Sequence, residues 1–127
     1  MTDIPDDIRR FVHESFDSVV KLEILLLLRS TPGRAFTSDD VAGALQASRD
    51  MMHTPLRELA GRGLLRPDDA NPSAYCYAPV DETLQAKVDA VAELYRVRRA
   101  AMVSLIYSQP VDRMQSFADA FKLRKEQ

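Results

Sequence analysis

The stretch from Phe36 to Leu65 constrains the fold more than any other part of this chain. Thr37 and Asp40 have the spacing of a capping box, in which two side chains satisfy the free backbone N–H groups at a helix start. Ser48 is also a residue type that favours the position just before a helix. The glycines of residues 61–63 are typical of a helix end. The stretch therefore predicts two short helices joined by a tight turn, with an abrupt exit into a strand.

Pro55 is the irregularity in this pattern. A proline inside a helix removes a backbone hydrogen bond and costs about 3 kcal/mol. The second helix, which we expect to begin at Arg49, should therefore kink near residues 51–54 or start its regular turns later. Its inward-facing positions repeat at the helical period: Met52, Leu56, Leu59 and Ala60.

Two further helices are predicted before this stretch. Residues 18–29 are apolar nearly all round, which is typical of a central, buried helix. Glu23 lies within this run, so we expect it to reach the surface or to pair with an arginine, because an unpaired buried carboxylate is costly. Residues 5–14 predict a short helix with one apolar face, which either covers the core or packs on a second subunit.

After the glycines, the pattern changes to that of a hairpin. The short segments 64–66 and 74–79 flank a turn-forming run, Pro67 to Ser73, and the second segment has alternating tyrosines. Two short strands with a polar tip are therefore expected. A third short strand near residues 34–36 would complete a small sheet.

The C-terminal third predicts helices again. From Glu82 to about Tyr107 we expect one long helix, and residues 112–124 predict a last amphipathic helix after Pro110. The long helix carries a heptad-like seam, in which Arg98 fills one place: Leu84, Val88, Val91, Tyr95, Met102 and Leu105. The fold class is therefore mainly α, a single domain over residues 1–127. Residues 18–79 form a three-helix core with a small β-hairpin, and residues 82–127 a dimerisation or partner-binding part.

Composition narrows the function classes. A chain of 127 residues is large enough for one domain with its own core. One cysteine and no basic-then-apolar leader indicate a cytoplasmic protein, and the longest apolar run, Ile24 to Leu28, is too short to span a bilayer. The motifs HExxH, CxxC and GxSxG are absent, so we expect no enzyme, no metal and no cofactor.

The order of helices and hairpin resembles the winged helix-turn-helix domain of bacterial transcription regulators, broadly of the MarR type. Three short runs carry the resemblance: Ser48-Arg49-Asp50, Leu56-Arg57-Glu58-Leu59 and Gly63-Leu64-Leu65. They are similar to the common recognition helix and its exit into the wing. The resemblance covers about residues 18–79, and the flanking helices look like the dimerisation part of such regulators.

The resemblance implies binding to double-stranded DNA by a homodimer, whose second helices read half-sites about one helical turn apart. The residues expected to contact bases or phosphates lie on that helix and on the hairpin, with Tyr75 as a further candidate: Ser48, Arg49, Asp50, His53, Thr54, Arg57, Arg66, Asn71 and Ser73. Between Ser48 and Arg66, four arginines against Asp50 and Glu58 give a net charge of +2.

Charge also supports other interpretations. The whole chain has a net charge of −2, and the acids Asp50, Asp68 and Asp69 would face DNA phosphates. The arginines of this region could thus be ordinary solvated residues. The alternative function is a protein-interaction adaptor or anti-regulator that uses the C-terminal helices and binds no DNA. A second basic cluster, Arg96, Arg98 and Arg99, is either a solvated or acid-paired face or a site for a phosphate or another anionic ligand.

Overall fold

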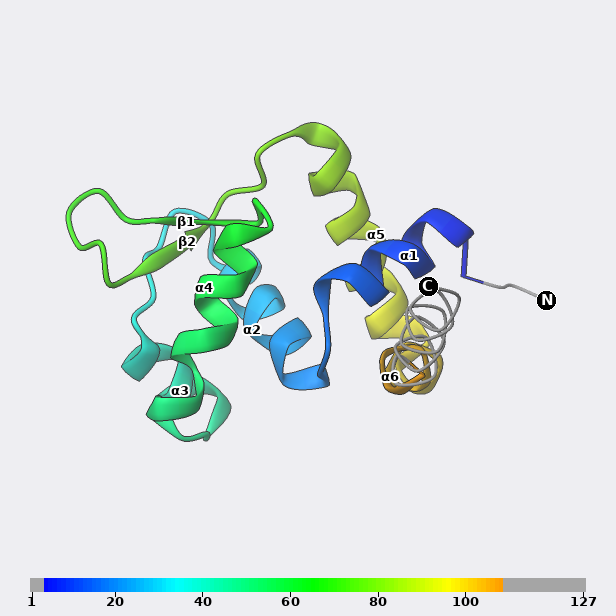
Figure 1. The fold of residues 1–127 in the computed structure, drawn as a ribbon, viewed down its shortest axis with the longest axis horizontal. Coiled ribbons are helices and arrows are strands. Elements are labelled where there is room, and N and C mark those ends of the chain that lie inside the picture. The colour runs from blue at the N-terminus through cyan, green and yellow to red at the C-terminus, as the bar shows by residue number, and fades with distance from the viewer. Residues whose placement is uncertain (1–3, 109–127) are drawn as a thin grey trace, which may run out of the picture.

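The structure, a computed structural model, describes residues 4–108 (Figure 1). This part is mainly helical, with one small antiparallel sheet of two strands. Its helices and strands are α1 (Asp6–Ser15), α2 (Val19–Ser30), α3 (Ser38–Leu45), the 3-10 turn η1 (Arg49–Met51), α4 (His53–Gly61), β1 (Leu65–Pro67), β2 (Tyr75–Tyr77), α5 (Glu82–Val97) and α6 (Arg99–Tyr107). The helix expected over residues 112–124 lies outside the described residues.

The start of α3 has the predicted capping box. The Asp40 N–H donates to the Thr37 hydroxyl at 3.1 Å, and the Thr37 N–H donates to the Asp40 carboxylate at 3.0 Å. Phe36 and Val41, one before the cap and one in the first turn, are both buried, as the packing of a hydrophobic staple requires. The helix ends at Leu45, and the next residue, Gln46, has the left-handed φ of 54°. The turn toward the second helix therefore begins at this left-handed residue, and the Ala47 N–H closes the end of α3 by donating to the Ala42 carbonyl at 2.9 Å.

Pro55 delays the second helix and does not kink it. Residues Arg49–Met51 form the separate turn η1, and regular α-helix begins only at His53. Pro55 then falls in the first turn of α4, where backbone N–H groups have no partner inside the helix. The expectation that Ser48 caps this helix is wrong, since its side chain makes no capping hydrogen bond. The regular helix simply starts too far along the chain for Ser48 to reach it.

The hairpin leaves α4 through Gly63. This residue has a φ of +81°, a conformation that strains any side chain, and a Cβ atom there would also lie within 3.1 Å of a methyl group of Val80. Strands β1 and β2 pair with Leu65 opposite Tyr77. The predicted third strand is reduced to one bridge between Phe36 and Tyr75, closed by two backbone hydrogen bonds of 2.8 and 2.9 Å.

The long C-terminal helix is broken, which corrects the sequence prediction. Arg98, with φ −134° and ψ 56°, leaves the helical conformation and separates α5 from α6. The change of direction lets both helices contact α1 (Figure 1). The seam residues Val91 and Met102 are fully buried, as is Val12 on the apolar face of α1. The interpretation of α1 as a cover for the core is confirmed.

Helix α2 joins the two halves of the molecule (Figure 1). It contacts α3, α4 and β2 on one side, and Leu22, Leu25 and Leu28 are fully buried. On the other side the Glu23 carboxylate accepts a 2.9 Å hydrogen bond from Tyr95 of α5 and pairs with Arg99 of α6 at 3.4 Å. The predicted arginine partner of Glu23 is thus confirmed. None of the described helices is long and apolar enough to cross a bilayer.

Candidate nucleic-acid interface

Helix α4 buries one face and leaves the other to solvent. Leu56 and Leu59 are fully buried, whereas His53, Thr54 and Arg57 are exposed. The residues just before α4 are exposed as well: Ser48, Arg49 and Asp50. The candidate DNA-contacting residues of the second helix therefore all lie on the surface, and none is diverted into the core.

The candidate residues of the hairpin are exposed too. Arg66 lies on β1, and Asn71 and Ser73 belong to the turn between the strands. The backbone N–H of Ser73 donates to the side-chain oxygen of Asn71 at 3.1 Å, while Asp68 accepts from Ala70 and Asn71. The turn is thus shaped by its own side chains, so these two residues have a fixed position on the surface.

A groove of about 410 Å³ connects the two parts of this surface. It lies between the start of α3, the start of α4 and the hairpin turn, and we call it the helix–hairpin groove. Its lining consists of Thr37, Ser38, Asp39, Arg49, His53, Pro72, Ser73 and Tyr75. Arg49, His53 and Ser73 from the candidate set, with Tyr75, are brought together here. The other six candidates do not line it.

Sequence reasoning missed the contribution of α3 to this groove. Thr37 and Ser38 place hydroxyl groups in the lining and Asp39 a carboxylate. The capping box explained Thr37 completely as a local feature, and nothing in the spacing indicates that the hairpin turn returns to the same place. The bridge between Phe36 and Tyr75 is what brings these segments together.

Two of the three arginines in the candidate DNA-contacting set have acidic partners. Arg49 lies 3.4 Å from the Asp39 carboxylate, and Arg66 lies 3.6 Å from that of Asp69. In the Arg49 pair both side chains are about two-thirds exposed, at 66% and 68%. Such exposed pairs contribute only about 0–1 kcal/mol, so a phosphate group could replace the carboxylate at little cost.

Arg57 differs from these two. No carboxylate within residues 4–108 forms an ion pair with it, although Glu58 is its neighbour in the chain. Glu58 instead accepts a 2.7 Å hydrogen bond from the buried Lys21 of α2. That hydrogen bond lowers the pKa of the Glu58 carboxyl. The negative charge of Glu58 is therefore compensated chiefly by Lys21 from inside the protein, with a smaller electrostatic contribution from Arg57. Arg57 remains an exposed cation on the surface of α4.

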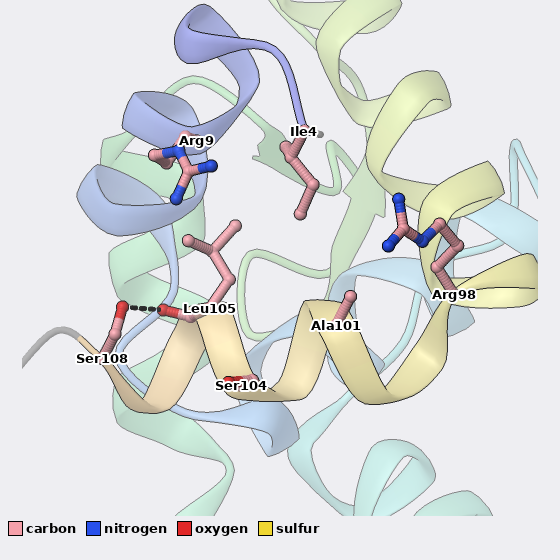
Figure 2. Close-up of a pocket in the computed structure, with 7 residues that line it drawn as sticks. All are labelled: Ile4, Arg9, Arg98, Ala101, Ser104, Leu105 and Ser108. Carbon is pink, nitrogen blue, oxygen red and sulfur yellow. Dashed lines mark hydrogen bonds between the residues drawn. The ribbon is translucent and has the colours of Figure 1, made fainter. Parts of the chain in front are cut away.

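The three arginines of the second basic cluster, Arg96, Arg98 and Arg99, have different surroundings. Arg96 pairs with Glu93 at 2.6 Å and Arg99 with Glu23, as the acid-paired interpretation expects. Arg98, at the break between α5 and α6, lines a separate cavity (Figure 2). Within residues 4–108, no group of three or more His, Cys, Asp or Glu side chains is arranged to hold a metal ion.

Comparisons of the chain with protein-family models, with curated proteins and with solved structures found no match.

Proposed function

We propose that this chain is a sequence-specific, DNA-binding transcription regulator of the cytoplasm, built as a winged helix-turn-helix protein broadly like the MarR type. In this proposal α3 and α4 are the helix-turn-helix, and the β1–β2 hairpin is the wing. The element order and the exposed outer face of α4 support it.

The helix–hairpin groove is the observation that carries the proposal. It joins Arg49 of η1 and His53, the first residue of α4, to Ser73 of the wing on one continuous surface. The start of α4 would enter the major groove, where Arg57 can meet a guanine edge. Thr37, Ser38 and Ser73 would donate to phosphate oxygens, and such contacts fix the register of the protein on the duplex.

Charge makes a homodimer necessary to this proposal. One subunit offers few phosphate contacts, and electrostatic affinity for DNA grows with the number of phosphates neutralised. The seam that suggested a subunit contact is buried within the chain, so dimerisation has to use other surfaces. Val97 of α5 and Tyr107 of α6 are 54% and 63% exposed, and they are apolar side chains available for such a contact.

The alternative function is a protein-interaction adaptor that does not bind DNA. The pairing of Arg49 with Asp39 and of Arg66 with Asp69 favours it, because both pairs reduce the positive charge of the surface. The unpaired charge of Arg57 and the continuous groove favour DNA.

Binding to pooled genomic DNA fragments, measured at low and moderate salt, distinguishes the DNA-binding regulator from the adaptor. Wild type is compared with Arg49→Ala/Arg57→Ala, and the matched control is Arg10→Ala/Arg96→Ala, which removes two exposed arginines from α1 and α5. We expect wild type and control to bind at low salt. The first variant should bind at least about tenfold more weakly, since each lost contact costs roughly 1 kcal/mol or more.

Absence of wild-type binding at low salt would reject the regulator, because the electrostatic contribution is largest there. Equal weakening of both double variants would show binding by bulk charge and would reject the assignment of the surface.

A further inference from the structure

Arg34, in the segment between α2 and α3, is an arginine to which the proposed function gives no role. Its side chain is exposed, and the central carbon of its guanidinium lies 4.3 Å from the centroid of the Phe36 ring. Phe36 itself is buried, with 2% of its surface exposed. A cation over an aromatic face is attracted by the negative charge above the ring. The buried ring therefore holds the Arg34 guanidinium at one place on the surface.

The bridge formed by Phe36 determines where this guanidinium lies. Phe36 pairs with Tyr75 in an antiparallel bridge, and directly opposite residues of such a pair place their side chains on the same face. Tyr75 and Thr37, the residue after Phe36, both line the helix–hairpin groove. In Figure 1 the segment before α3 (cyan) runs alongside the hairpin before it turns into α3. Arg34 thus lies beside the groove, between the hairpin and the first helix of the helix-turn-helix.

The charge of Arg34 is not consumed by an ion pair. Within residues 4–108 no carboxylate forms an ion pair with it, in contrast to Arg49 and Arg66. The pKa of the Asp40 carboxyl is lowered, chiefly by the hydrogen bond from the Thr37 N–H and less by the charge of Arg34. That carboxylate is already engaged in the capping box of α3. Arg34 is therefore an available cation close to the start of α3.

The hydrogen-bond donors of Arg34 are available as well. A guanidinium carries five N–H donors in a fixed planar fork. Contact with the Phe36 ring uses the charge of the group, and within the described part of the chain the Arg34 side chain donates no hydrogen bond. A planar fork of donors matches two oxygens of a phosphate group. The chemistry of this side chain therefore fits a phosphodiester.

We propose that Arg34 contacts a phosphate of the DNA backbone beside the helix–hairpin groove. This inference rests on the proposed function, and it adds a contact that belongs neither to the recognition helix nor to the wing. A duplex that receives the start of α4 in its major groove, and whose phosphates meet the hydroxyl groups of the groove, passes beside the segment that carries Arg34. Phosphate contacts carry no sequence information, so Arg34 would strengthen binding to every sequence alike.

The salt dependence of binding measures such a contact. Fluorescence anisotropy gives the affinity of the full chain for two labelled duplexes, a fragment recovered from pooled genomic DNA and the same fragment with its sequence shuffled. Each phosphate contact adds about 0.9 to the steepness of log affinity against log salt concentration. Arg34→Gln, which keeps most of the side-chain stem, should therefore flatten this slope by about 0.9 for each bound subunit and by the same amount on both duplexes.

Two further variants serve as controls. Arg34→Lys keeps the positive charge and should retain the slope of wild type. Arg10→Gln removes an exposed arginine of α1, on a helix that does not line the groove, and should leave both the slope and the affinity unchanged.

A slope for Arg34→Gln equal to that of wild type would overturn the phosphate contact and leave the proposed function intact. A loss of affinity confined to the recovered fragment would overturn it as well, because it would show a contact with bases. Equal flattening in Arg10→Gln would replace the assigned contact by a general charge effect. Absence of wild-type binding to the pooled DNA at low salt would overturn the proposed function, and this inference with it.

Discussion

The two halves of the molecule are held together in different ways. From α3 to β2, turns and helix ends are fixed by residues close in sequence, such as the box of Thr37 and Asp40 and the left-handed Gly63. The half made of α1, α5 and α6 joins the beginning of the described chain to its end. It depends on the apolar faces of α1, α5 and α6, which meet only after folding and bury residues such as Val12 and Met102 completely.

This difference determines where each half can carry function. In the first half, local bonds fix the backbone and leave the outer face of α4 free for polar contacts. In the second half, the apolar faces of α1, α5 and α6 pack on one another. Polar side chains such as Arg9 and Ser104 lie at the edge of this packing, where they line a cavity. Helix α2 belongs to both halves, through its buried leucines and through Glu23.

The largest expected effect concerns the link through α2. Leu56→Ala should lower the free energy of unfolding by about 2–5 kcal/mol, because Leu56 is fully buried where α4 packs on α2. Since α2 joins the halves, urea denaturation followed by circular dichroism should still show one transition. Val20→Ala, at a position 44% exposed, is the control and should change the free energy by less than about 0.5 kcal/mol. Two separate transitions would show that the halves fold independently.

A smaller effect is expected at the contact between Lys21 and Glu58. Glu58→Gln removes the nearer of the two carboxylates that pair with the buried Lys21 within residues 4–108 and leaves Asp17, at 3.9 Å. The free energy of unfolding should fall by about 1–2 kcal/mol. The lower end of this range is expected, because the Glu58 side chain is half exposed. Asp50→Asn, which removes an exposed acid of η1, should have no such effect on denaturation.

The same contact should make stability depend on pH. The hydrogen bond from Lys21 lowers the pKa of Glu58 in the folded protein below its ordinary 4.5. The contribution is therefore fully present above pH 4.5 and is lost as the pH falls through the lowered pKa. A pH series of urea midpoints should show this loss in wild type and a flatter curve in Glu58→Gln. If the two curves of urea midpoint against pH were parallel, Glu58 would not be the source of the pH dependence.

The capping box of α3 should contribute less to the free energy of unfolding than the Lys21–Glu58 contact does. Thr37→Ala removes the acceptor for the Asp40 N–H and should cost about 1 kcal/mol in thermal denaturation. Ser38→Ala, one residue further along, is the matched control and should be nearly neutral. An equal loss in both variants would mean that α3 is held by packing and not by its cap.

The smallest effect should be a gain in binding. Asp39→Asn releases Arg49 from its 3.4 Å partner, so under the proposed function DNA affinity should rise about two- to fivefold, the equivalent of an exposed ion pair. Asp6→Asn, which removes the same charge from α1, should change affinity little. A filter-binding comparison at one salt concentration is sufficient, and an equal gain in both variants would indicate a general charge effect.

The contrast between the halves also explains which sequence predictions succeeded. The capping box and the glycine exit were predictable because neighbouring residues make the bonds. The delayed start of α4 was one of two outcomes expected for Pro55, and the structure selects it.

The break at Arg98 was not predictable in this way. The heptad-like spacing continues through it, with no proline or glycine to mark an end. After the break α6 contacts α1, which is far away in the sequence, and Met102 is fully buried. Such a tertiary contact leaves no local signal in the sequence. The helix–hairpin groove was missed in part for the same reason, since Asp39 joins it through tertiary contacts.

Amide shift mapping by NMR tests the division of function between the halves most directly. A fragment recovered from the pooled genomic DNA is titrated into labelled wild-type protein at low salt. The account predicts that the largest shifts fall on Arg49, His53, Arg57 and Ser73, while α1, α5 and α6 change little. Shifts concentrated on α5 and α6, or no shifts at any DNA concentration, would contradict it.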